Sequence, residues 1–254
     1  MNVFSFKEAE VLLGASILMH YPPLFIVGPN KIGKTEMIKN VCAYYNRENE
    51  IVKFTTGVDY GGLKQFVQYA NNSIKTIALS DIQTILSRKG NVMNSTMGYI
   101  STLVEEGATE EITFSRFSRD LIERKVNFII AGTPRHIVKL FRANQVDFLT
   151  RFLYVPVDRD MKDVDMSVPY QVQKLPTTLD LNKLNDWTLL ANLDVVANSP
   201  RDAKMINQLF LALNAMGYDI SNINIILKKI AVFSEPEDTD MRWQELYKRL
   251  ISPV

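Results

Sequence analysis

The chain has few of the residues that build disulfide or metal frameworks. Its 254 residues include one cysteine, Cys42, and two histidines, His20 and His136. One cysteine excludes a disulfide framework and a multi-cysteine metal site, and two histidines argue against a histidine-rich metal centre. This composition is typical of proteins in a reducing compartment, so we expect a cytoplasmic location.

The sequence also lacks a charge excess and a long apolar run. Lys+Arg number 29 and Asp+Glu 28, a net charge of +1, which excludes nucleic-acid binding through overall basicity but not through a local basic patch. The apolar stretch over residues 11–19 is too short to cross a membrane and is followed by Pro22 and Pro23. No basic region precedes it, so we expect neither a membrane partner nor a secretory signal.

Short apolar runs alternate with amphipathic segments along the first two-thirds of the chain. Strands separated by helices favour a three-layer α/β fold with a five-stranded parallel sheet. The expected strands cover residues 24–27, 51–55, 76–79, 127–131 and 152–157.

We expect three units along the chain. An α/β core over residues 1–160 begins with a helix over residues 5–19. A polar linker with prolines covers residues 161–176, and helical patterns fill residues 177–254. The helices on either side of Gly217 suit a simple lid or a helix-turn-helix, as in a winged-helix-like subdomain.

The most specific motif follows the first expected strand. Residues 28–35 match G-x-x-x-x-G-K-T without a mismatch. In such a loop backbone N–H groups face a phosphate, the lysine reaches the β- and γ-phosphates, and the threonine hydroxyl ligates Mg²⁺. The motif therefore predicts a site for ATP and Mg²⁺. The predicted nucleotide-binding residues here are Gly28, Pro29, Asn30, Lys31, Ile32, Gly33, Lys34, Thr35 and Glu36.

An ATPase with this loop also needs a carboxylate at the end of a neighbouring strand. The third expected strand is followed by Ser80-Asp81-Ile82-Gln83. This segment resembles the AAA+ ATPases, whose strand ends in two acids and an apolar residue, and is similar to the Asp-Asp-Ile-Gln of the DnaA replication initiators. The resemblance implies that Asp81 acts in catalysis and metal binding.

One of the two acids is missing in either register. Either Ser80 replaces the metal-side acid and Asp81 is the catalytic one, or Asp81 is the metal-side acid and Ile82 replaces the catalytic one. Asp81 then serves metal and water together, or Glu105, Glu106 or Asp59 assists it. A strand-end aspartate without a role, and slow or absent hydrolysis, remain open alternatives.

The AAA+ resemblance covers residues 20–157, and more weakly the helical remainder. It implies that Thr133 is the sensor 1 residue near the γ-phosphate, with a plain turn residue as the alternative. Arg151, in a segment similar to the Ser-Arg-Phe of MCM-type helicases, would reach the ATP of a neighbouring subunit, or else pair with Asp147.

A third residue is implied in the helical remainder. Arg201 resembles the sensor 2 arginine that the lid presents to bound ATP. A basic residue in the first turn of a helix needs a compensating anion, and Asp202 is the alternative partner to a nucleotide.

The partners follow from these assignments. Arg151 implies a homo-oligomer, possibly a ring. Basic residues interleaved with aromatic ones suit single-stranded nucleic acid, although a solvated helix face explains them equally. They are Phe114, Arg116, Phe117, Arg119, Arg124 and Lys125.

We therefore expect an ATP-hydrolysing AAA+-like protein that acts on nucleic acid as a replication initiator, helicase, loader or viral or plasmid motor. The alternative is a nucleotide-gated switch that barely hydrolyses ATP and regulates a protein partner. A small-molecule kinase is the weakest hypothesis, because a kinase gains nothing from Arg151.

Overall fold

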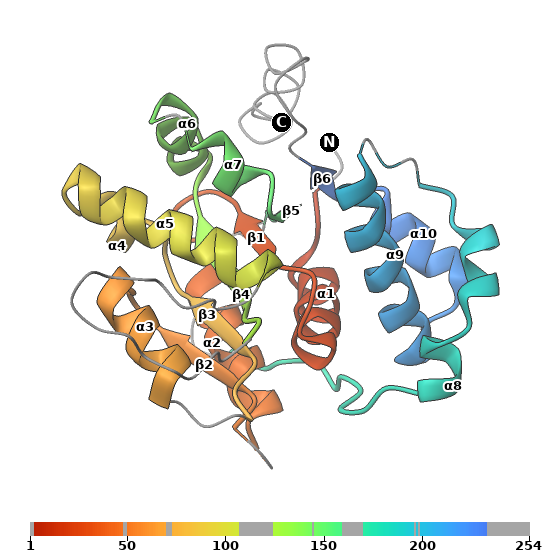
Figure 1. The fold of residues 1–254 in the computed structure, drawn as a ribbon. Coiled ribbons are helices and arrows are strands. Elements are labelled where there is room, and N and C mark those ends of the chain that lie inside the picture. Colours follow the sequence, from red (N-terminus) through yellow and green to blue (C-terminus); the bar gives the residue numbers. More distant parts are fainter. Residues whose placement is uncertain are drawn as a thin grey trace.

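The computed structural model describes residues 3–47, 50–69, 73–106, 124–143, 145–158, 170–195, 197 and 199–232. Its centre is a six-stranded sheet in the order β2-β3-β4-β1-β5-β6 (Figure 1). Five strands are parallel, and only the short β6 runs antiparallel, against β5. The strands are β1 (Leu24–Val27), β2 (Val52–Thr55), β3 (Thr76–Leu79), β4 (Asn127–Gly132), β5 (Leu153–Pro156) and β6 (Ala231–Val232).

The central strands are buried on both faces. Every residue of β1, β3, β4 and β5 is buried, as expected of parallel strands that carry helices above and below. Successive side chains point to opposite faces, so Leu24 and Ile26 of β1 join one hydrophobic cluster while Phe25 and Val27 join the other. The expected three-layer α/β fold with five parallel strands is confirmed.

Helices from the two ends of the chain cover the first face. In Figure 1, α1 (Phe6–Met19) lies between the sheet and α9 (Pro200–Ala215), and it also packs against α2 (Lys34–Tyr45). Ser5 caps α1, because its hydroxyl accepts the N–H of Glu8 at 3.3 Å and its own N–H donates to the Glu8 carboxylate at 2.8 Å. Because it is enclosed by these neighbours, α1 is apolar on nearly every side.

The second face is covered by helices from the middle of the chain. They are α3 (Tyr60–Tyr69), α4 (Gln83–Leu86), α5 (Gly90–Glu105), α6 (Pro134–Arg142) and α7 (Val146–Leu149). Helix α5 begins earlier than the apolar pattern around Met97 indicates. Its first buried residue is Thr96, so two exposed turns precede the periodic part.

The C-terminal helices pack on the core. The described end of the expected linker, residues 170–176, runs along the first helices: Tyr45 donates its hydroxyl to the Pro176 carbonyl at 2.9 Å. Residues 180–192 form two turns, α8 (Leu181–Leu184) and a 3₁₀ helix (Trp187–Asn192), where we expected one helix. Asp180 and Asp186 each cap a separate start. Helix α10 (Ile220–Leu227) follows α9.

Within the described residues, no helix combines the length and apolarity that crossing a bilayer requires.

Candidate functional site

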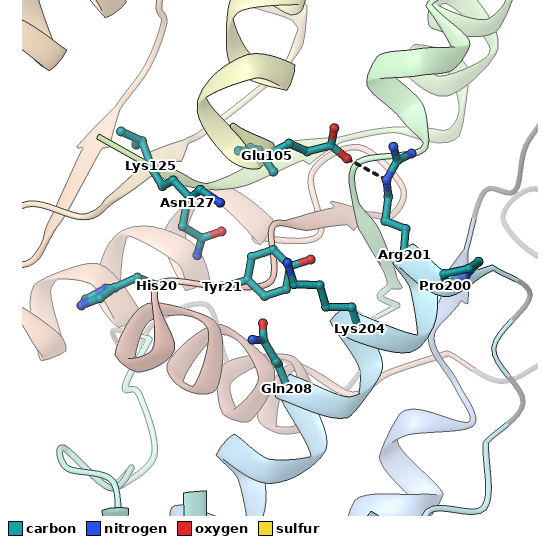
Figure 2. Close-up of a pocket in the computed structure, with 11 residues that line it drawn as sticks. His20, Tyr21, Glu105, Lys125, Asn127, Pro200, Arg201, Lys204 and Gln208 are labelled. Atoms are coloured by element: carbon teal, nitrogen blue, oxygen red, sulfur yellow. Dashed lines mark ion pairs between the residues drawn. The ribbon is translucent and has the colours of Figure 1, made fainter. Parts of the chain in front are cut away.

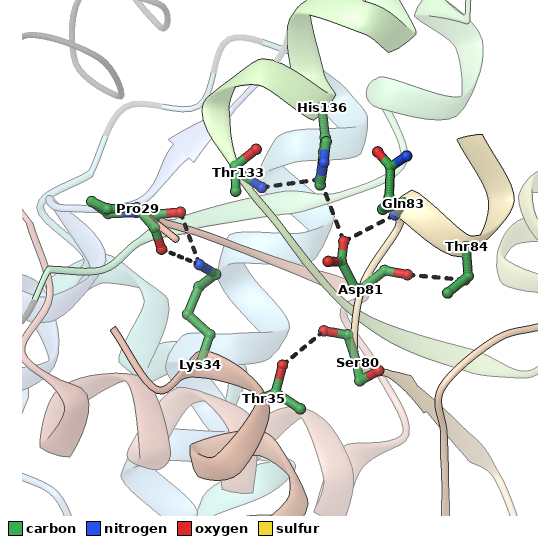
Figure 3. A network of polar contacts seen from close by, with 10 residues as sticks. Pro29, Lys34, Thr35, Ser80, Asp81, Gln83, Thr84, Thr133 and His136 are labelled. Atoms are coloured by element: carbon green, nitrogen blue, oxygen red, sulfur yellow. Dashed lines mark hydrogen bonds and ion pairs between the residues drawn. The ribbon is translucent and has the colours of Figure 1, made fainter. Parts of the chain in front are cut away.

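The carboxyl ends of β1, β3 and β4 meet at one edge of the sheet, because the strands are parallel. Val27 pairs with Gly132, and Leu79 pairs with Ile130. The next residues along each strand therefore gather at this edge, which we call the carboxyl edge. Figure 3 shows Lys34, Thr35, Asp81 and Thr133 together there.

The loop of residues 28–35, the candidate phosphate loop, needs glycine at two positions. A Cβ on Gly28 would lie 2.4 Å from the Val157 carbonyl oxygen, so no side chain fits there. Gly33 has φ 94° and is the N-cap of α2. With no side chain at the N-cap, the first N–H groups of α2 face outward as an anion site would require.

Lys34 is held inside the loop. Its side-chain ammonium donates to the carbonyl oxygens of Gly28, at 2.9 Å, and Pro29. Burial lowers the pKa of Lys34 to about 8, against the opposing effect of the Asp81 charge, so the group is charged at pH 7. An ammonium has three donors.

Thr35 connects α2 to the end of β3. Its hydroxyl donates to the Ser80 carbonyl oxygen at 3.3 Å. In Figure 3 that carbonyl faces Thr35, while the Ser80 hydroxyl points away. Residue 80 thus offers a main-chain oxygen, not a carboxylate, to the threonine.

Asp81 lies beside this pair with a half-exposed carboxylate. One of its oxygens accepts the backbone N–H of Gln83 at 2.9 Å, and the Asp81 carbonyl accepts the Thr84 hydroxyl at 3.0 Å. Asp81 therefore starts the α4 turn, and its carboxylate also faces Lys34 closely enough to oppose the effect of burial on the lysine pKa.

The expectations for Thr133 meet an unexpected neighbour, His136. Thr133 is buried at the start of α6, and its N–H donates to Nδ1 of His136 at 3.3 Å. The same Nδ1 lies 3.4 Å from the Asp81 carboxylate. Burial lowers the pKa of His136, and the Asp81 charge partly offsets that effect. Sequence reasoning missed this residue, although its place three residues after an N-cap is a capping-box signal.

Arg151 and Arg201 lie at the opposite, amino edge of the sheet. Glu105 receives both: its Oε2 lies 3.0 Å from Nε of Arg151, and its Oε1 lies 2.7 Å from Nε of Arg201 (Figure 2). Both guanidinium groups also donate to the Thr150 hydroxyl, at 3.2 and 3.1 Å. Arg151 further pairs with Asp147 at 2.8 Å, the alternative expected from the sequence.

This cluster is remote from the candidate phosphate loop. Arg201 lies close to Tyr21, which precedes Gly28 by seven residues of mostly extended chain, or about 20 Å. The structure therefore does not bring Arg201 to the phosphate loop of its own chain. Glu105 is likewise too far away to assist Asp81, and Asp59 accepts the Gly62 N–H at 2.7 Å at the start of α3.

The basic residues considered for nucleic acid divide into two groups. Phe114, Arg116, Phe117 and Arg119 lie outside the described residues. Arg124 is 5% exposed, donates to the Ile74 carbonyl at 2.6 Å and lies 4.9 Å over the Phe66 ring. Its guanidinium thus joins β3 to α3 and is turned away from solvent, whereas Lys125 is exposed.

The lysines of the possible helix-turn-helix are paired within the chain. Lys228 pairs with Asp194, and Lys229 pairs with Glu8 at 2.5 Å. These contacts attach α10 to its surroundings, which is the behaviour of a packed lid.

The carboxyl edge has a donor set that suits Mg²⁺ only together with phosphate. In the described part of the chain no three His, Cys, Asp or Glu residues come together as a metal site. Thr35 and Asp81 supply one hydroxyl and one carboxylate, and Mg²⁺ is usually held by one or two carboxylates with substrate phosphates and water.

Comparison with known proteins leaves this geometry as the basis for assigning a function. No protein-family model matches the chain, and no curated protein matches it either.

Proposed function

We propose that the protein is a P-loop ATPase of the AAA+ kind, which binds ATP with Mg²⁺ at the carboxyl edge and acts on nucleic acid. One observation carries the proposal. The G-x-x-x-x-G-K-T loop connects a buried parallel strand to a helix whose N-terminus has no side-chain cap, with the Lys34 ammonium held inside it.

Each residue at this edge has a task in the proposal. Backbone N–H groups of residues 29–35 hold the phosphates, and Lys34 exchanges its loop carbonyls for phosphate oxygens. Thr35 and Asp81 would hold the metal, which neutralises phosphate charge when bound. Asp81 also orients the attacking water, and Thr133 lies where it would sense the γ-phosphate.

The proposal places Arg151 in a different subunit's site. It lies at the amino edge, so within an oligomer it would face the carboxyl edge of the next copy. Its side chain is 12% exposed and bound to Glu105 and Asp147, so this role requires Arg151 to leave at least one acid. Action on nucleic acid rests on the AAA+ resemblance, and among the described residues Lys125 is the exposed basic residue in that region.

A second function is favoured by two observations. Ser80 stands where AAA+ enzymes have an acid, and Glu105 holds both arginines in the absence of a neighbour. A chain with one acid and restrained arginines suits a nucleotide-gated switch, which binds ATP, hydrolyses it slowly and regulates a protein partner.

The test is ATP binding and hydrolysis by the purified chain, alone and with single- or double-stranded DNA. The variants are Lys34→Ala and Asp81→Asn. The matched controls are Lys39→Ala, which removes an exposed lysine of the same helix, and Asp219→Asn, which keeps a good N-cap.

We expect Lys34→Ala to abolish binding, and Asp81→Asn to bind ATP while losing turnover. Turnover that rises with DNA in the wild type supports the motor. Binding without turnover above that of Asp81→Asn selects the switch. If the wild type binds no more ATP than Lys34→Ala, both proposals fail.

A further inference from the structure

A second pocket opens at the amino edge, remote from the candidate phosphate loop. Its volume is about 530 Å³, within the range of small-molecule sites. The ends of α1, α5, β4 and α9 form its walls (Figure 2). The lining side chains that matter here are Tyr21, Glu105, Lys125, Asn127, Arg201 and Lys204.

Asn127 contributes a buried acceptor without a partner. Its side chain is 3% exposed, and within the described part of the chain its Oδ1 has no hydrogen-bond partner. A buried unsatisfied oxygen carries a desolvation penalty and calls for an explanation.

The orientation of that amide is determined by Ser16. The Asn127 Nδ2 donates to the Ser16 carbonyl at 3.1 Å and to its hydroxyl oxygen at 2.8 Å. The Ser16 hydroxyl donates its own hydrogen to the Pro22 carbonyl at 2.7 Å, so it can only accept from Asn127. The NH₂ group must therefore face Ser16, and Oδ1 faces Tyr21, as Figure 2 shows.

The pocket lining has an excess of positive charge. It contains three cationic side chains, Lys125, Arg201 and Lys204, and one carboxylate, Glu105, which gives a net charge of +2. Glu105 is bound by Arg201 and, from outside the pocket, by Arg151. A phosphate monoester carries a charge of about −1.5 to −2 at pH 7 and so complements this lining.

An aromatic ring lies between the acceptor and the cations. Tyr21 is partly buried, and the Lys204 ammonium lies 5.8 Å from its ring centroid. Arg201 and Lys204 are three residues apart on α9, so they share one face of the helix. The pocket thus offers a ring to stack on, a cationic wall beside it and an inward-facing acceptor.

We propose that this pocket binds a nucleoside monophosphate unit, supplied either as a free nucleotide or as the phosphorylated end of a single strand. The base packs against Tyr21 and donates an N–H to Asn127 Oδ1, while the phosphate lies against Lys204 and Arg201, with Lys125 opposite. This inference does not depend on ATP binding at the carboxyl edge.

The two histidines allow the sites to be followed separately. His20 lines this pocket, whereas His136 lies beside Asp81 at the carboxyl edge. The chain has no other histidine. We would titrate full-length protein, in the Lys34→Ala background and without Mg²⁺, with AMP, with a 5′-phosphorylated oligonucleotide and with its unphosphorylated form, and follow the ring Cε1–H resonances by NMR.

We expect a saturable shift of the His20 resonance with a steady His136 resonance. Charge reversal in Lys125→Glu with Lys204→Glu should weaken binding about tenfold or more. The matched control, Lys7→Glu with Lys183→Glu, makes the same charge change on exposed lysines away from the pocket and should bind normally. Tyr21→Phe keeps the ring and the affinity, whereas Tyr21→Leu should lose about fivefold or more.

The oligonucleotides distinguish the sources. A shift with AMP alone identifies a free nucleotide as the ligand, and a shift that requires the 5′-phosphate on the strand identifies a strand end. The proposal is overturned if no ligand moves His20 at millimolar concentration, or if the pocket and control charge reversals bind equally. Because Lys34 is absent in this background, failure here leaves the ATPase proposal untouched.

Discussion

His136 and Asp81 face each other across the carboxyl edge, with 3.4 Å between the imidazole Nδ1 and a carboxylate oxygen. The same Nδ1 accepts the backbone N–H of Thr133. One nitrogen cannot accept a hydrogen from Thr133 and donate one to Asp81, so the protonation state selects the partner. Neutral His136 caps α6, and protonated His136 pairs with Asp81.

Acid should destabilise the protein through its histidines. Burial lowers the pKa of His136, and burial together with Lys75 lowers that of His20, each from about 6.5. A lowered histidine pKa means that the unfolded chain binds the proton more tightly. The stabilisation is therefore fully present above pH 6.5 and is lost as the pH falls through the folded values.

NMR titration of the two Cε1–H resonances and urea unfolding across pH check this. Both titration midpoints should lie below 6.5, and His136→Asn should reduce the loss of unfolding free energy in acid while costing about 1 kcal/mol at neutral pH. A His136 midpoint above 6.5 would contradict the prediction.

The affinity for nucleotide should fall in mild alkali because Lys34 loses its charge. Its pKa is about 8 in the free protein, below the ordinary 10.5, and phosphate binds the protonated form. Above pH 8 the affinity should fall by up to about tenfold per pH unit. In the same range the unfolded chain holds the proton that folded Lys34 has lost, so this residue's contribution to folding stability rises with pH.

Calorimetric titration with ATP between pH 7 and pH 10 measures this slope. Lys34→Arg is the control, because a guanidinium stays charged throughout. It should bind more weakly but with no slope, and a wild-type affinity that is equally flat would count against Lys34 as the phosphate ligand.

Removing the charge of Glu105 should destabilise the fold. Glu105→Gln leaves Arg151 and Arg201, which are 12% and 30% exposed, without their shared carboxylate. We expect a loss of about 2 kcal/mol in the free energy of unfolding. Glu106→Gln, next in sequence and exposed, should change it by less than about 0.5 kcal/mol. Equal urea midpoints for the two variants would show that the cluster contributes nothing.

A methyl group on Gly28 should deform the candidate phosphate loop. The new Cβ would meet the Val157 carbonyl oxygen at 2.4 Å, and that oxygen belongs to the backbone and cannot rotate away. Gly28→Ala should cost about 1–3 kcal/mol and weaken ATP binding.

Gly98→Ala is the matched control on α5, where nothing lies within 4 Å of the added Cβ. It should stabilise the helix by about 0.5–1 kcal/mol, because alanine is the better helix former. Thermal unfolding of both variants measures the contrast, and similar shifts in the two would argue against the close approach at Gly28.

The sequence by itself determined the local features. The five parallel strands are recognisable because strands buried on both faces are continuous apolar runs. The loop of residues 28–35 is recognisable because its glycines, lysine and threonine act through local backbone geometry. The start of α9 was equally clear, because Ser199, Pro200 and Asp202 satisfy helix-start rules within four residues.

Only the tertiary structure decided which distant residues meet. The order of the strands places Thr133 and His136 beside Asp81, and no periodicity in the sequence reports that neighbourhood. The packing of α9 on α1 carries Arg201 to Glu105 at the amino edge, away from the loop that the resemblance assigned to it.

The unpaired oxygen of Asn127 likewise exists only because Ser16, more than a hundred residues earlier, occupies the other side of the amide. Contacts of this kind depend on the register of strands and the docking of helices, which the whole core determines. A local pattern carries information about its own segment, and the partners of a side chain depend on every segment that packs around it.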